Sequence, residues 1–193
     1  MQRKSFIKLL LSALGYIVLG NVMCLVMTMA ISMFGLNWFT KILAIVCCTA
    51  VFFMLVFTAA WKDGVRERSL VKLGRVESEL KHRWVLIGIV AGFIAAVPTI
   101  ILLLNKLFFP QEDTLFVYRF ISGSAYPFVL AFVEPVITES MAWEETTLRQ
   151  IDNMSPLFPA LMLIYYALIP VVSQIGYRMG FNDTLNSDKI MYK

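Results

Sequence analysis

Residues 84–109 read WVLIGIVAGFIAAVPTIILLLNKLFF, a run in which Lys106 is the only charged side chain. An α-helix of about 20 apolar residues is long enough to cross the hydrocarbon core of a bilayer, which is roughly 30 Å thick. This run is therefore long enough to span a membrane, and it decides the fold class of the chain.

Three further apolar runs have the same character, and they cover residues 6–34, 38–61 and 157–180. In the chain of 193 residues, 59% are hydrophobic and 16% are charged, whereas a soluble domain has about 25% charged residues. The first run exceeds the apolar core of a cleavable signal peptide, which is about 7–15 residues long, so we expect a retained anchor helix. The sequence predicts an all-α polytopic transmembrane helical bundle, with residues 1–193 forming a single integral membrane domain.

A weaker segment covers residues 115–137 and contains Arg119, Glu134 and two prolines. A charge at the centre of a bilayer costs about 2.5–3.5 kcal/mol on insertion scales, and proline interrupts the hydrogen bonds of a helix. We therefore predict a broken segment, either buried by its neighbours, re-entrant or interfacial. Acidic residues flank it on both sides, which favours four spans with both termini inside; five spans with an external C-terminus is the alternative.

The loop at residues 62–83 is strongly basic. Its cations are Lys62, Arg66, Arg68, Lys72, Arg75, Lys81 and Arg83. Short cytoplasmic loops are enriched in Lys and Arg, so we expect this loop and the basic N-terminus to be cytoplasmic. The loop is either simply solvated or a contact patch for anionic lipid or a cytoplasmic partner.

Polar side chains at membrane depth are the candidate binding residues. They are Asn21, Arg119, Glu134 and Gln174. Such residues commonly mark solute pathways or structural pairs within a bundle. A bend near residues 123–127 would bring Arg119 and Glu134 together, as a structural ion pair or in a polar cavity that binds a small solute.

Small residues recur at every fourth position in two of the apolar runs. The first stripe is Gly88, Gly92 and Ala96, and the second is Gly176 and Gly180. Small residues at this spacing let helix backbones approach closely. We predict that they pack helices within the bundle; the alternatives are homodimerisation and docking on another membrane subunit.

One short motif suggests chemistry. Glu144, Glu145 and Arg149 form an EExxxR pattern that resembles the first motif of membrane-embedded CAAX-type proteases. Those proteases also need histidines on later helices, and this chain has no histidine after His82. We therefore predict a protein that is not an enzyme.

No phosphate-binding loop, metal-ligand spacing or nucleotide fingerprint occurs in the sequence, and its three cysteines lie within apolar runs. The sequence thus predicts no cofactor, no metal and no nucleic-acid partner.

Two stretches carry a family resemblance. Residues 64–77, GVRERSLVKLGRVE, and residues 169–181, IPVVSQIGYRMGF, resemble a group of small uncharacterised integral membrane proteins of low-GC Gram-positive bacteria. The resemblance implies a bacterial plasma membrane location and a cytoplasmic 62–83 loop. It implies no catalytic or binding residue.

From these features we predict a non-enzymatic accessory or structural membrane subunit. Its expected partners are the lipid bilayer and either another membrane subunit or further copies of the chain. The alternative function is a small-solute carrier, or the substrate-binding subunit of an energy-coupled transporter.

Overall fold

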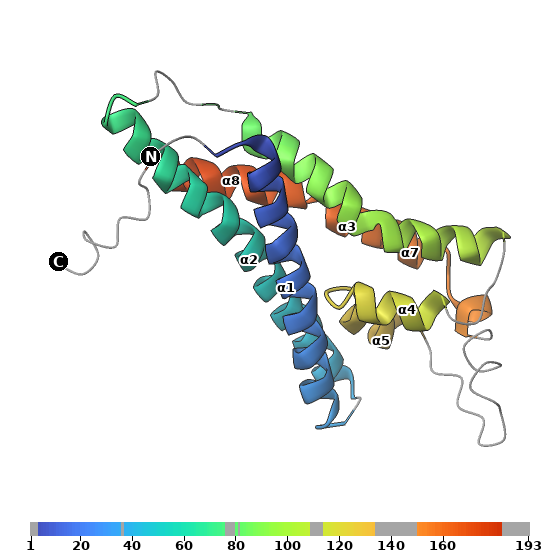
Figure 1. Ribbon diagram of the computed structural model, residues 1–193. Helices are drawn as coiled ribbons and strands as arrows, with labels where there is room; N and C mark the ends of the chain where they lie inside the picture. Colours follow the sequence, from blue (N-terminus) through green and yellow to red (C-terminus); the bar gives the residue numbers. More distant parts are fainter. Residues whose placement is uncertain are drawn as a thin grey trace. The chain divides into compact units, whose positions relative to one another are not determined.

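The computed structural model describes residues 4–35, 37–75, 80, 82–108, 114–133 and 150–182. Within these ranges the secondary structure is helical, without strands, and four helical segments are long and apolar enough to cross a membrane (Figure 1). These segments are α1 (Phe6–Ser32), α2 (Trp38–Lys72), α3 (Arg83–Phe108) and the consecutive helices α7 (Leu157–Ala167) and α8 (Ile169–Asn182). The predicted all-α fold with four spans is confirmed, and the chain is a multi-pass membrane protein.

The exposed surface of the four spans is apolar, as expected for helices that contact lipid. In the most apolar stretch of each span, only 28% to 39% of the residues are buried inside the protein. The exposed remainder is rich in large aliphatic and aromatic side chains. Contact of so much apolar surface with water is unfavourable, and lipid chains remove that cost.

A tight turn joins α1 to α2. Gly35 has a φ of +94°, a conformation that glycine adopts without a steric penalty. Asn37 then caps α2, because its Oδ1 accepts a hydrogen bond from the backbone N–H of Thr40 at 2.8 Å. This turn sets the two helices antiparallel over a short connection.

Helix α2 continues beyond Trp61 to Lys72, so much of the segment expected to be a loop is helical. Gly74, which has a φ of +66°, follows the last turn of this helix. The N–H groups of Gly74 and Arg75 donate to the carbonyls of Val71 and Leu70, the pattern of a Schellman motif. The helix therefore ends just before the second glycine of the basic stretch rather than at Trp61.

The segment after α3 is broken, as predicted. It consists of α4 (Thr114–Ile121), a turn at residues 122–125 and α5 (Tyr126–Phe132). Pro127 lies in the first turn of α5, where its missing N–H removes no helical hydrogen bond. Helices α4 and α5 contact each other (Figure 1), and residues 134–137 of the predicted segment lie outside the described residues.

The fourth span is interrupted at Leu168, between α7 and α8. Pro170 follows two residues later, and it lacks the N–H that would bond to the carbonyl of Tyr166 in a continuous helix. By contrast, α3 continues through Pro98 without a break.

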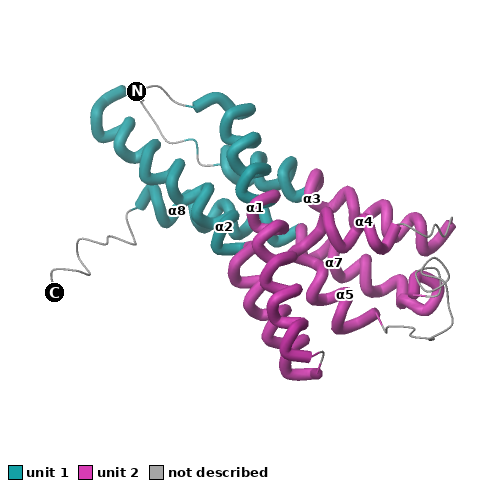
Figure 2. Tube along the Cα trace, turned by 60° about the horizontal axis from the view of Figure 1, so that its bottom comes forward, with its two compact units in different colours: residues 1–17, 53–92, 167–193 teal, residues 18–52, 93–166 magenta. Residues whose placement is uncertain are grey.

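The chain forms two compact units (Figure 2). Unit 1 comprises residues 1–17, 53–92 and 167–193, and unit 2 comprises residues 18–52 and 93–166. Trp84, Ile87 and Tyr177 lie in the core of unit 1, with exposed fractions of 1% or less. The core of unit 2 is built around buried aromatic rings and thiols.

Candidate functional site

The turn of the broken segment rests on Asn21 of α1, in unit 2. The backbone N–H of Ser124 donates to the Asn21 Oδ1 at 3.0 Å. A Cβ at Gly123 would overlap the Asn21 carbonyl oxygen, so the close approach of the two backbones requires glycine. Asn21 thus supports the turn that separates α4 from α5.

Hydroxyl groups gather beside this turn. The Ser124 Oγ lies 3.4 Å from the Tyr166 hydroxyl, and the Thr99 Oγ1 lies 3.2 Å from the Tyr118 hydroxyl. Ser122 and Thr99 also lie beside the Tyr166 hydroxyl. All five residues are at most 2% exposed. We call Thr99, Tyr118, Ser122, Ser124 and Tyr166 the hydroxyl cluster; its polar atoms are hydrogen-bonded to one another and are closed off from the surface.

Aromatic rings form the wall next to the hydroxyl cluster. Tyr165 lies 5.7 Å from Phe52, 5.6 Å from Phe128 and 5.4 Å from Tyr166, measured between ring centroids. Stacked and edge-to-face pairs at these separations stabilise a fixed arrangement of rings. The side chain of Tyr165 is therefore held in place from three sides.

Two cations of unit 2 hold the chain just before α7. The Arg119 Nη2 donates to the Gln150 Oε1 at 3.0 Å, and the Lys106 Nζ donates to the Asp152 carbonyl oxygen at 2.5 Å. The proposed partner of Arg119, Glu134, lies outside the described residues. What the structure shows for Arg119 is a contact with a neutral amide.

The remaining candidate, Gln174, is half-buried in α8 and belongs to unit 1. Asn21 and Arg119 both lie in unit 2, but they bond to different groups, Ser124 and Gln150.

The glycines of both stripes lie inside unit 1. A Cβ at Gly88 would lie 2.6 Å from the Pro170 Cα, and one at Gly176 would lie 2.6 Å from the Phe57 carbonyl oxygen. A Cβ at Gly180 would overlap the Trp61 carbonyl oxygen. These glycines allow α8 to contact α2 and α3. Gly92 and Ala96 are also buried.

Unit 1 also contains a buried carboxyl pair that the sequence analysis missed. Asp63 and Glu67 are 7% and 3% exposed and lie one helical turn apart on α2. The Trp84 Nε1 donates to the Asp63 Oδ2 at 3.0 Å. In the sequence, the pair is visible as two acidic residues four positions apart inside a basic run. Residues at this spacing lie on the same face only if the run is helical.

Two basic residues of unit 1 donate hydrogen bonds to groups elsewhere in the unit. Lys62 donates from its Nζ to the Tyr16 hydroxyl at 2.9 Å, and Arg83 donates to the Lys4 carbonyl oxygen. Lys72 and Arg75, at the end of α2, are exposed. The end of α2 is therefore accessible to an anionic surface or partner.

Two thiols of unit 2 face each other across α1 and α2. The Cys24 Sγ donates to the Cys48 carbonyl oxygen at 3.3 Å, and the Cys48 Sγ donates to the Cys24 carbonyl oxygen at 3.5 Å. Both residues are fully buried. They act here as small core residues that also satisfy backbone carbonyls.

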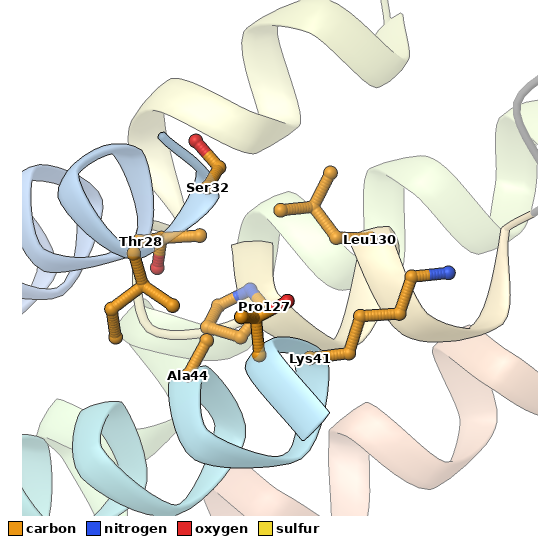
Figure 3. Close-up of a pocket in the computed structure, with 8 residues that line it drawn as sticks. Thr28, Ser32, Lys41, Ala44, Pro127 and Leu130 are labelled. Atoms are coloured by element: carbon orange, nitrogen blue, oxygen red, sulfur yellow. The ribbon is translucent and has the colours of Figure 1, made fainter. Parts of the chain in front are cut away.

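Three cavities of unit 2 differ in size and lining. The smallest, of about 10 Å³, lies between α1, α2 and α5, and the Lys41 amine points away from Thr28 and Ser32 there (Figure 3). It has room for about one water molecule. A second cavity, of about 350 Å³, lies between α3 and α4. A third, of about 420 Å³, lies between α5 and α7.

The described residues contain no group of three or more His, Cys, Asp or Glu side chains that could hold a metal ion. The motif residues Glu144, Glu145 and Arg149 lie outside the described residues. No known family, curated protein or solved structure matches this chain.

Proposed function

We propose that this membrane protein is a non-enzymatic accessory or structural subunit of a larger membrane assembly. The main observation in support is that polar side chains of the interior are hydrogen-bonded to other groups of the protein. Asn21, the hydroxyl cluster and Asp63 are engaged in hydrogen bonds within their own units. Polar groups used in this way stabilise one arrangement of helices and are not presented to a solute.

The cavities support the same proposal. Both larger cavities of unit 2 are lined mainly by apolar side chains. A carrier for a hydrophilic solute needs a concave site with several convergent polar groups. The described part of unit 2 offers apolar concavities instead.

The docking surface must differ from the glycine stripes, because Gly88, Gly176 and Gly180 contact neighbouring helices of their own unit. The exposed cations Lys72 and Arg75 are a better candidate for polar contacts with a partner. They lie in the segment that we propose to be cytoplasmic from its excess of Lys and Arg. The resemblance to membrane proteins of low-GC Gram-positive bacteria supports a bacterial plasma membrane and a cytoplasmic 62–83 segment, and the basic N-terminus, two spans earlier, is then cytoplasmic as well.

The test is affinity purification in a mild detergent from a native host, followed by mass spectrometry. The unaltered protein is compared with the double variant Lys72→Gln, Arg75→Gln and with the control Lys8→Gln, which removes another exposed cation of unit 1. We expect a reproducible membrane partner that the double variant recovers poorly and the control recovers normally. A protein that purifies alone would contradict the proposal.

The broken segment favours a second candidate, the substrate-binding subunit of an energy-coupled transporter. Interrupted helices with buried polar residues at the break are common in transporter binding sites. Here the break places Ser122 and Ser124 in the interior of unit 2. Co-purification of ATPase subunits, and loss of solute binding in Arg119→Ala without loss of the partner, would favour this candidate.

A further inference from the structure

The cavity between α5 and α7 has a defined apolar lining. Its volume is about 420 Å³, and its walls are Phe128, Phe132, Ser155, Leu157, Phe158, Leu161, Met162 and Tyr165. Cavities that hold small ligands in proteins have volumes of about 300–1,000 Å³. This cavity is therefore large enough for a ligand, and nearly all of its surface is hydrocarbon or aromatic ring.

The polar atoms in the lining have partners within the protein. The Ser155 Oγ accepts a hydrogen bond from the Leu157 N–H at 3.3 Å. The Tyr165 hydroxyl interacts with the Thr49 hydroxyl. A hydrophilic solute in the cavity would find few unused groups to replace its bonds to water, so its entry would be unfavourable.

The cavity opens on the outer face of a membrane span. Phe132, Leu157 and Leu161 line it and are 61%, 69% and 63% exposed. Leu157 and Leu161 belong to the fourth span. The exposed face of a span is in contact with lipid chains, so hydrocarbon is the medium next to the opening.

The inner end of the cavity is rigid. Met162 and Tyr165 are at most 9% exposed. Tyr165 is also fixed by the rings of Phe52, Phe128 and Tyr166. A wall held by this many ring contacts does not close over the space, and an empty cavity of this size would forfeit dispersion contacts along its lining.

We propose that this cavity is a lipid-binding site that takes one hydrocarbon chain of a bilayer lipid between α5 and α7. The chain enters past Leu157 and Leu161 and contacts the rings of Phe128 and Phe158. The site is independent of the proposed accessory role, because a bound lipid chain requires no protein partner.

The test uses photo-crosslinking in vesicles of phosphatidylcholine that contain a phospholipid with a diazirine near the end of one acyl chain. After irradiation, mass spectrometry locates the labelled residues. We expect strong labelling of Phe128, Phe158 or Met162. In Leu161→Trp, which fills the cavity, labelling of these residues should fall about tenfold.

The matched control is Ile164→Trp. Ile164 lies on the same helix and is 62% exposed, but it does not line the cavity. Labelling of the cavity residues should stay at the level of the unaltered protein. If Leu161→Trp does not fold, Leu157→Trp fills the same opening.

Two results would overturn the proposal. Equal labelling around the whole exposed surface of α7, unchanged by the cavity-filling variants, would show only the surrounding bilayer lipid. Labelling of Ile164 without any labelling of the cavity residues would show that protein covers the opening.

Discussion

Unit 1 buries acidic side chains as well as a neutral hydroxyl, that of Ser173, whereas the buried polar contacts described in unit 2 are made by neutral groups. In unit 1, Asp63 and Glu67 are buried on α2, and Asp63 accepts from Trp84. In unit 2, the hydroxyl cluster is buried, whereas its neighbour Asn21 and the cations Lys106 and Arg119 are half-buried.

The difference reflects the cost of removing each kind of group from water. An ionised carboxylate without partners is far more costly to bury than an amide or a hydroxyl. The stretch that contains Asp63 also carries Lys62, Arg66 and Arg68, so cations are close at hand in the sequence. The hydroxyl cluster of unit 2 lies among apolar side chains, where neutral hydrogen bonds are less costly than buried charges.

The largest effect is expected from Gly123→Leu. This substitution disrupts unit 2 where the backbone of the turn at residues 122–125 lies closest to the backbone of α1. The new side chain overlaps the Asn21 carbonyl oxygen, and relief requires the turn to move away from α1. We expect a loss of at least about 3 kcal/mol of unfolding free energy, measured by SDS titration in mixed micelles. Gly15→Leu is the control, because a Cβ there has nothing within 4 Å; equal losses in both variants would argue against the close approach.

Two opposite substitutions test the difference between the units directly, one that adds a carboxylate to unit 2 and one that removes a carboxylate from unit 1. Asn21→Asp places a carboxylate in unit 2, and it should cost about 2.5 kcal/mol on the scale for charges at membrane depth. Asp63→Asn keeps an oxygen acceptor for Trp84 and should cost much less. The same SDS titration checks both, and equal costs would mean that the two environments do not differ.

Sequence reasoning found the spans and the break because both depend on local properties of the chain. Length and apolar content identify a spanning helix without knowledge of its neighbours, and glycine and proline predicted a bend near residues 123–127, where the structure has a turn at residues 122–125. It did not find the helical continuation to Lys72, because the excess of positive charge was interpreted as a loop. That error hid Asp63 and Glu67, which share a helix face only when the segment is helical.

The polar contacts could not be predicted for a different reason. Asn21 and Ser124 are 103 residues apart, and Asp63 and Trp84 are 21 residues apart. Each contact exists because particular faces of two helices meet. Hydropathy fixes which residues enter the membrane, but not which faces pack together.

A smaller loss is expected from Asp63→Ala, which tests the contact in unit 1 alone. The substitution leaves the buried Trp84 Nε1 without the acceptor that it now has at 3.0 Å. An unsatisfied buried donor costs about 1–3 kcal/mol, so we expect a loss of about 2 kcal/mol in the same titration. A double-mutant cycle with Trp84→Phe isolates the bond from the cavity that the smaller ring leaves: Asp63→Ala, Trp84→Phe should lose less than the sum of the two single losses, and additive losses would mean that the bond contributes little.

The smallest effect concerns single hydroxyl groups, and it separates a buried contact from an exposed one. Tyr166→Phe removes a hydroxyl that lies within the hydroxyl cluster, and hydrogen bonds between helices in membranes contribute about 0.6 kcal/mol on average. Tyr16→Phe removes the acceptor of an exposed Lys62 contact, which should matter less because water replaces the lost oxygen. Melting curves in detergent should therefore give a lower melting temperature for Tyr166→Phe than for Tyr16→Phe. The reverse order would show that the hydroxyl cluster is not a stabilising feature of unit 2, and it would remove the argument that these groups are committed to the fold rather than available to a solute.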